Sequence, residues 1–440
     1  MTRFSHAAAL GPAFLWLAGC GSPPAPPPAR LPAPPPAQAT SLSAPPERLG
    51  RIVDRYWDER VPLGTALAPQ SLADSLALER HSLAEILAIP RDSLDAESRL
   101  TYDIFRRQRE QDIEGFTYPA ELLPINPFGS PPFELARAAA DMGQVPLNNA
   151  EECGNWLLRI DGTVRWIRQA IANMREGMRR GYTSPRVLME RAAPLLQGLG
   201  EDTSANVFYL PLRTMPEAIK DPHRTRLGAT LNTAVKDQLL PAIRELHDFI
   251  QREYLPMARS SVALSALPLG TPWYESRVRR ATDTRLTPNE IHSMGLAEVE
   301  RIRVRLQSIP AMPPTGDPAD LLTAYRDLKV LTVTAMPALF SALPKADFEI
   351  REANPLGGAG AALEYRRAAA DGATPAILYV STVSAARSAT VEIAEFLQET
   401  LPGRHLQSAL QQERVDLPKF RRWGDLRGGA RRDGARRDGA

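Results

Sequence analysis

The chain has 440 residues, of which 43% are hydrophobic and 24% are charged. This composition is typical of a globular protein with enough chain for one large domain or two ordinary ones. The 53 lysine and arginine residues nearly balance the 51 aspartate and glutamate residues. This balance excludes a basic field for nucleic acid and the acidic excess of a disordered chain. The two cysteines, Cys20 and Cys153, are too few for a disulfide framework.

Residues 1–20 have the organisation of a signal peptide. Arg3 supplies a short positive region, and an apolar run from Ala7 to Ala18 follows. That run suits a signal peptide and is short for a membrane span. It ends in Leu-Ala-Gly before Cys20, which resembles the lipobox of bacterial lipoproteins. We expect Cys20 to be lipidated, so that the protein is anchored to a membrane and does not span it. An ordinary signal peptide is the alternative.

Residues 21–46 are rich in proline and follow directly after this segment. Proline removes backbone donors and favours an extended polyproline II conformation, which cannot pack as a helix or a sheet. We therefore predict a semi-rigid tether that holds the body of the protein on the periplasmic face of a bacterial membrane, in the cell envelope.

From Glu47 onward, apolar residues recur at helical spacing. The pattern predicts helices around 49–57, 100–105, 156–180 and 231–254. Ser184 followed by Pro185 predicts a further helix that starts with a cap residue and a proline in its first turn. Apolar stripes of this kind are expected to be core.

A capping box predicts the next helix start. Thr287 can accept a hydrogen bond from a free backbone amide while Glu290 reaches back, and Pro288 stands where no donor is needed. The apolar stripe that follows is also expected to be core; it contains Ile291, Met294, Val299, Ile302 and Leu306.

Strand signals appear near residue 346. Three segments rich in β-branched and aromatic residues predict strands at 347–351, 363–366 and 376–382, with Asp371-Gly372 as a turn. Helical spacing returns from Thr390 to about Glu413. The sequence thus predicts a mainly α protein with a small β-sheet before its last long helix.

This region resembles the bacterial family catalogued as domain of unknown function 885. In that family an Asp-Gly-Ser-Arg-Pro-Gly turn and a strand precede a helix that carries His-Glu-x-x-Pro-Gly-His-His-Leu-Gln. Here the corresponding segments are DGATPAILYVST at 371–382 and QETLPGRHLQ at 398–407. Segments such as TYDIFRRQ, LLPINPFG, NWLLRI and LTPNEIHSMGLAEVERIR also resemble the family, so the likeness covers most of residues 47–425.

The resemblance implies a zincin-like helical body and a zinc-dependent peptidase-like activity. In such sites neutral imidazoles bind Zn²⁺ and a glutamate takes a proton from the bound water. Seven residues of a straight helix span about 10.5 Å, too far for two ligands of one ion. Pro402 and Gly403 can kink the helix and shorten that gap.

The motif departs from the family pattern at its metal ligands. Gln398 replaces the first histidine, and an amide is a poor zinc ligand. Arg404, a fixed cation, replaces the first of the paired histidines. His405 is the motif histidine that remains and is the candidate metal ligand; the sequence leaves open which of the paired histidines is the ligand in the family. Glu399 occupies the general-base position. The strand-end arginine of the family is Thr374, and after Gly424 the chain diverges from a family helix that resembles the source of a carboxylate ligand.

These departures predict an envelope lipoprotein with a degenerate metal site, no bound zinc and no peptidase activity. Two alternatives stay open. The chain is an active metallopeptidase that recruits Glu395, Glu399 and His405, or it is a non-catalytic tethered protein that binds peptides.

Residues 426–440 repeat RRDGA and have no apolar face, so they are expected to be a disordered tail or a frameshift product. Cys153, near Trp156, is expected to be a buried apolar residue.

Overall fold

A computed structural model describes most of the protein after the predicted tether: residues 47–60, 67–127, 129–140, 149–215, 219–308, 318–353, 363–369, 375–381 and 389–424. The predicted signal peptide with Cys20, the tether, Asp371, Gly372, Thr374 and the tail lie outside these residues. The described residues are mainly helical with one small sheet, which confirms the expected fold class.

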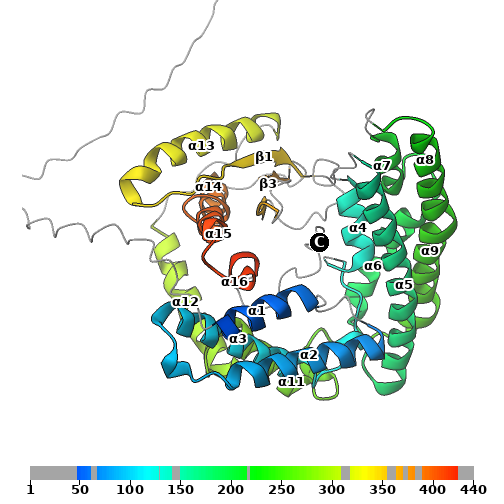
Figure 1. Cartoon of the computed structure of the whole chain (residues 1–440). Coiled ribbons are helices and arrows are strands. Elements are labelled where there is room, and N and C mark those ends of the chain that lie inside the picture. The colour runs from blue at the N-terminus through cyan, green and yellow to red at the C-terminus, as the bar shows by residue number, and fades with distance from the viewer. Residues whose placement is uncertain are drawn as a thin grey trace, which may run out of the picture. The chain divides into compact units, whose positions relative to one another are not determined.

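Helices account for most of the described chain (Figure 1). In chain order the α-helices are α1 (Glu47–Glu59), α2 (Pro69–Leu87), α3 (Ala96–Gly115), α4 (Pro131–Ala140), α5 (Ala150–Arg180), α6 (Arg186–Gly200), α7 (Leu210–Arg213), α8 (His223–Thr233), α9 (Leu240–Phe249), α10 (Leu255–Met257), α11 (Gly270–Thr282), α12 (Pro288–Leu306), α13 (Pro318–Leu339), α14 (Ala389–Glu399), α15 (Arg404–Glu413) and α16 (Lys419–Trp423).

The largest hydrophobic core surrounds α5, a helix of 31 residues. Asn149 caps its start by accepting a hydrogen bond from the Glu152 amide at 2.9 Å, and Gly181 ends it in the left-handed conformation. Its apolar stripe is buried, as predicted: Trp156, Ile160, Val164, Ile167 and Ile171. Cys153 is fully buried beside it, which confirms its expected apolar role.

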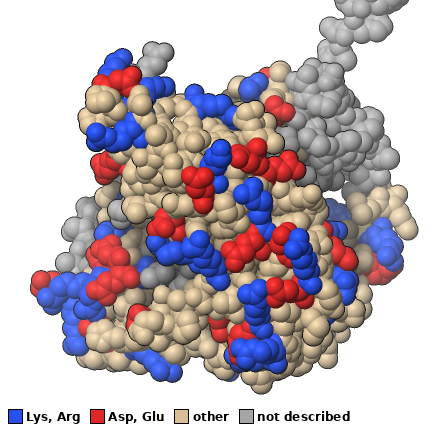
Figure 2. All heavy atoms as spheres, turned by 90° about the vertical axis from the view of Figure 1, so that its right-hand side faces the viewer, with Lys and Arg blue, Asp and Glu red and all other residues tan. Residues whose placement is uncertain are grey.

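On the face shown in Figure 2, acidic and basic side chains are interspersed.

The amphipathic stretch at 231–254 forms a continuous helix with two widened segments. The π-helical segments η4 (Ala234–Leu239) and η5 (Ile250–Tyr254) separate α8, α9 and α10. Each π segment ends shortly before a proline, Pro241 or Pro256. Because proline lacks an amide hydrogen and its ring clashes with the preceding turn, a widened turn accommodates it.

The predicted cap at Ser184 is wrong. Helix α6 begins at Arg186, its cap position is Pro185, and no side chain caps it. Ser184 is buried, and its backbone amide donates to the Tyr254 hydroxyl at 2.7 Å. The first free amide of α6, that of Arg186, donates instead to the Arg259 carbonyl at 2.8 Å.

The capping box at Thr287 is confirmed, but the core prediction for the helix that follows it is wrong. The Thr287 side chain accepts from the Glu290 amide at 3.2 Å, and the Thr287 amide donates to Glu290 at 2.7 Å. Helix α12 nevertheless has no buried residue. Met294 is 61% exposed and Leu306 is 58% exposed. The pattern predicted the helix and its apolar face correctly but not a neighbour to cover that face.

The three predicted strands are confirmed and form one sheet. They are β1 (Phe348–Glu352), β2 (Leu363–Arg366) and β3 (Ala376–Val380), in the order β1-β3-β2. The central strand β3 pairs in parallel with β1 and antiparallel with β2. All five residues of β3 are buried, as expected for a strand covered on both sides. This sheet, α13, α14 and α15 enclose a second hydrophobic core that surrounds Phe348 and Phe396.

Candidate functional site

The peptidase-like motif lies at a break between two helices. Helix α14 ends at Glu399, and α15 begins at Arg404. The Thr400 carbonyl accepts from the His405 amide at 2.9 Å across the break. A Cβ atom on Gly403 would lie 2.0 Å from the Gln398 carbonyl oxygen, so this close approach requires glycine. Pro402 and Gly403, which were expected to kink one helix, thus separate α14 from α15.

Glu399 and Arg404 form an ion pair across this break. A guanidinium nitrogen of Arg404 lies 2.7 Å from a carboxylate oxygen of Glu399, whose side chain is 13% exposed. Gln398 is exposed on the last turn of α14. The general-base position therefore faces a fixed cation, and the position of the first family histidine faces solvent.

His405 is buried, with a residue exposure of 1%. Its Nε2 atom is 3.0 Å from the Ala346 carbonyl oxygen, and its Nδ1 atom is 2.9 Å from the Tyr365 hydroxyl. A carbonyl oxygen can only accept, so Nε2 carries the proton and Nδ1 accepts from Tyr365. The ring also contacts Phe348, with ring centroids 4.9 Å apart. Burial lowers the pKa of His405, which favours the neutral ring.

These donors do not fit a zinc ion. Both ring nitrogens of His405 are engaged in hydrogen bonds, and the Glu399 carboxylate is engaged with Arg404. Glu395, the third member of the alternative ligand set, is half-buried on α14 and has an interaction of its own. Among the described residues, no three histidine, cysteine, aspartate or glutamate side chains are arranged to hold a metal ion. The arrangement can position the two helices on the sheet.

The segment after the motif packs on the N-terminal helices. Phe420 of α16 lies in an edge-to-face contact with Phe105, with ring centroids 5.4 Å apart. Lys419 forms an ion pair with Asp58 at 2.8 Å, and Arg421 pairs with Glu97. The family-like Phe-Arg-Arg-Trp-Gly segment at 420–424 therefore joins α15 to α1 and α3.

A buried charge cluster, which the sequence did not indicate, links α2, α3 and α11. It consists of Glu79, Arg109, Asp112 and Arg280 (the Glu79 cluster). Arg109 lies 2.9 Å from Glu79 and 2.7 Å from Asp112, and Arg280 lies 2.6 Å from Asp112. The Tyr56 hydroxyl donates to Glu79 at 2.7 Å. Burial, and then the charge of Asp112, raise the pKa of Glu79 to about 9.

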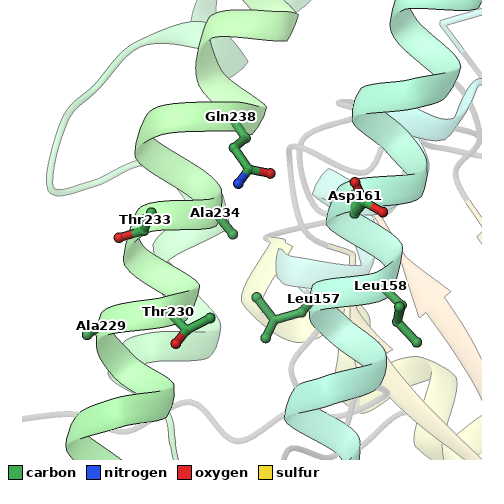
Figure 3. Close-up of a pocket in the computed structure, with 8 residues that line it drawn as sticks. All are labelled: Leu157, Leu158, Asp161, Ala229, Thr230, Thr233, Ala234 and Gln238. Carbon is green, nitrogen blue, oxygen red and sulfur yellow. The ribbon is translucent and has the colours of Figure 1, made fainter.

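Two surface cavities lie away from the motif. A groove of about 580 Å³ runs between α5 and the α8–η4 helix (Figure 3), and its lining residues are Leu157, Leu158, Asp161, Ala229, Thr230, Thr233, Ala234 and Gln238. Its carboxylate, Asp161, is paired with Arg165 on the same helix. A cavity of about 290 Å³ lies near His247 and Arg244. In the second cavity His247 Nδ1 lies 3.1 Å from a carboxylate oxygen of Asp248.

The described residues thus form a mainly helical protein with one three-stranded sheet and a break between α14 and α15. The family model "Bacterial protein of unknown function (DUF885)" matches residues 46–330 and 310–430. The chain belongs to this family.

Two solved structures match this chain, and the first has a similar fold. The first is described as "the putative lipoprotein from Colwellia psychrerythraea"; the match has a TM-score of 0.68 and 18% identity, and covers 80% of this chain and 66% of that one. The chain thus spans about two thirds of that protein, and the likeness concerns the fold. The second, "a putative lipoprotein of unknown function from Shewanella oneidensis", gives a TM-score of 0.47 and 12% identity, with 86% and 73% coverage. No curated protein matches.

None of the helices in the described ranges combines the length and the apolar character needed to cross a membrane. The longest, α5, has charged residues along its length.

Proposed function

We propose that this protein is a lipid-anchored component of the bacterial envelope whose metallopeptidase-like motif has a structural role and does not hydrolyse peptides. The observation that carries the proposal is the state of His405. Its ring is buried, and its nitrogens bond to Tyr365 and to the backbone of Ala346. A histidine that ligates zinc must offer an unprotonated nitrogen to the ion. Here metal binding would have to break a buried hydrogen bond.

The ion pair between Glu399 and Arg404 supports the same proposal. In a zinc peptidase the zinc ion beside the general base has an open coordination position. A water molecule bound there has a lowered pKa. A guanidinium has no coordination position, so it neutralises Glu399 without activating water. Gln398 adds no imidazole to compensate.

The lipobox-like segment before Cys20 supports the envelope location, and so does a fold like that of a protein described as a lipoprotein. The acyl chains on Cys20 would hold the protein at the membrane, and the proline-rich segment at 21–46 would act as its tether. Without catalysis, the remaining role is that of a tethered binding protein, with peptides as candidate ligands.

Metal content and hydrolysis test the proposal directly. The purified full chain should contain far less than one zinc per molecule, and a pool of unstructured peptides should stay intact with or without a chelator. Glu399→Gln is the matched control, because it removes the base and should change nothing. One bound zinc per chain together with chelator-sensitive cleavage that Glu399→Gln abolishes would refute the proposal and favour an active metallopeptidase.

The anchor is tested separately. The wild-type chain should sediment with membranes after expression in a bacterium, and Cys20→Ser should release it into the soluble fraction. Equal membrane association of both forms would contradict lipidation at Cys20.

A further inference from the structure

Helix α12 is exposed along nearly all of its length, with Pro288 and Ile291 half-buried. Every side chain from His292 to Leu306 is exposed, and the helix buries none of its 19 residues. In proteins, helices are stabilised mainly by the packing of an apolar face. Val299 is 53% exposed and Ile302 is 41% exposed, so the apolar face of α12 has no cover among the described residues.

This face is built for contact with another helix. Ile291, Gly295, Val299, Ile302 and Leu306 follow one another at spacings of four, four, three and four residues. At 3.6 residues per turn these positions fall within an arc of about 80°, which gives the narrow seam of a helix pair. At Gly295 no atom lies within 4 Å of the place that a Cβ would occupy. A second helix can therefore approach the backbone closely at that point.

The charges beside the seam identify the occupant. Glu290 and Glu298 lie on one flank, towards the N-terminal end, and Arg301 and Arg305 lie on the same flank, towards the C-terminal end. In an antiparallel pair of identical helices, each flank faces the same flank of its partner. Glu298 would then lie between its own Arg301 and Arg301 of the other copy, and Glu290 would meet Arg305. In a parallel pair this flank would face the other flank of its partner, so these charges would not pair.

The distances within one chain are compatible with this exchange. Arg301 Nε donates to Glu298 at 2.7 Å within the helix, and both side chains are more than half exposed. Their outward positions allow each to reach a second partner without leaving the first. The surface is therefore complementary to itself.

We infer that two copies of this chain associate through α12, antiparallel, around a twofold axis that passes near Glu298 and Val299. A helix of 19 residues is about 28 Å long. One helix pair gives an interface at the small end of the range for specific complexes, so the dissociation constant is on the order of micromolar.

Sedimentation equilibrium of the full chain in detergent tests the inference at about 1–100 µM, the range that brackets such a constant. The wild-type chain should shift from monomer to dimer. Val299→Glu places two carboxylates together at the axis and should weaken the dimer at least about tenfold. Val304→Glu is the matched control, because Val304 is similarly exposed, at 60%, on the opposite side of α12. Circular dichroism checks that both variants keep their helix content.

A charge swap tests the antiparallel direction. Glu298→Arg and Arg301→Glu should each weaken self-association, and an equimolar mixture of the two should restore it, because each arginine then meets a glutamate. A monomeric wild-type chain across this range would overturn the inference and assign the face to a different polypeptide. Equal effects of Val299→Glu and Val304→Glu, or a mixture that stays monomeric, would overturn it as well.

Discussion

Helices α5 and α12 have similar sequence signals, but α5 is packed in the main core and α12 is exposed. Each begins at a residue whose side chain accepts from a backbone amide, Asn149 in α5 and Thr287 in α12. Each has an apolar stripe at helical spacing. Helix α5 buries twelve residues in the main core, and α12 buries none. The comparison teaches that periodicity defines the face of a helix, whereas burial depends on a neighbour that the helix does not encode.

Truncation of the two stripes gives the sharpest contrast. Trp156→Ala should lower the free energy of unfolding by about 3–5 kcal/mol, because it opens a cavity in the core. Val299→Ala should change it by less than about 0.5 kcal/mol in the monomer. Urea denaturation of dilute protein measures both. Equal losses in the two variants would show that α12 packs within its own chain.

The second test contrasts buried and exposed polar residues of the motif. His405→Ala removes the acceptor of the Tyr365 hydroxyl and the donor to the Ala346 carbonyl. We expect a loss of about 2–4 kcal/mol in the free energy of unfolding. Gln398→Ala, at an exposed position on the last turn of α14, should cost less than about 0.5 kcal/mol. Thermal unfolding of both variants checks this, and a silent His405→Ala would contradict a structural role for the ring.

The third test concerns Glu79, a buried titratable residue. Glu79 has a raised pKa of about 9 in the folded state against 4.5 as its ordinary value. The folded state therefore holds a proton that the unfolded state releases between these values. The free energy of unfolding should fall as pH rises from 7 to 9, by up to about 1.4 kcal/mol per pH unit. Glu79→Gln, which stays neutral, should flatten this slope. An unchanged slope in denaturation midpoints would exclude Glu79 as its source.

The smallest expected effect concerns the ion pair of the motif. Glu399→Gln should lower the free energy of unfolding by only about 0.5–1 kcal/mol, because Arg404 is 31% exposed and solvent screens the pair. Arg404→Gln should have a similar effect, and the double variant should cost no more than either alone. Urea denaturation measures this cycle. Additive losses would show that the two side chains do not act as a pair.

Local signals predicted much of the fold. The caps at Thr287, the stripe from Trp156 to Ile171 and the three strands were recognisable because each depends on residues close in the chain. The cap assigned to Ser184 failed because the Arg186 amide at the start of α6 donates to the carbonyl of Arg259, which is distant in the sequence. The buried cover expected for α12 failed because the pattern contains no information on the partner.

The candidate site was predictable in its composition but not in its bonding. The motif positions Gln398, Glu399, Arg404 and His405 could be read from the sequence. The partners of His405 could not, because Ala346 and Tyr365 lie 59 and 40 residues away on the sheet side of the fold. The Glu79 cluster was missed for the same reason, since its members come from three helices.

Nitrogen NMR of the His405 side chain tests the central claim most directly. In a chain labelled at histidine, with His405→Gln used to assign the signal, we predict a neutral ring with the proton on Nε2 at pH 7. The signal should stay unchanged when excess zinc is added. A zinc-dependent shift of either ring nitrogen of His405 would contradict the account.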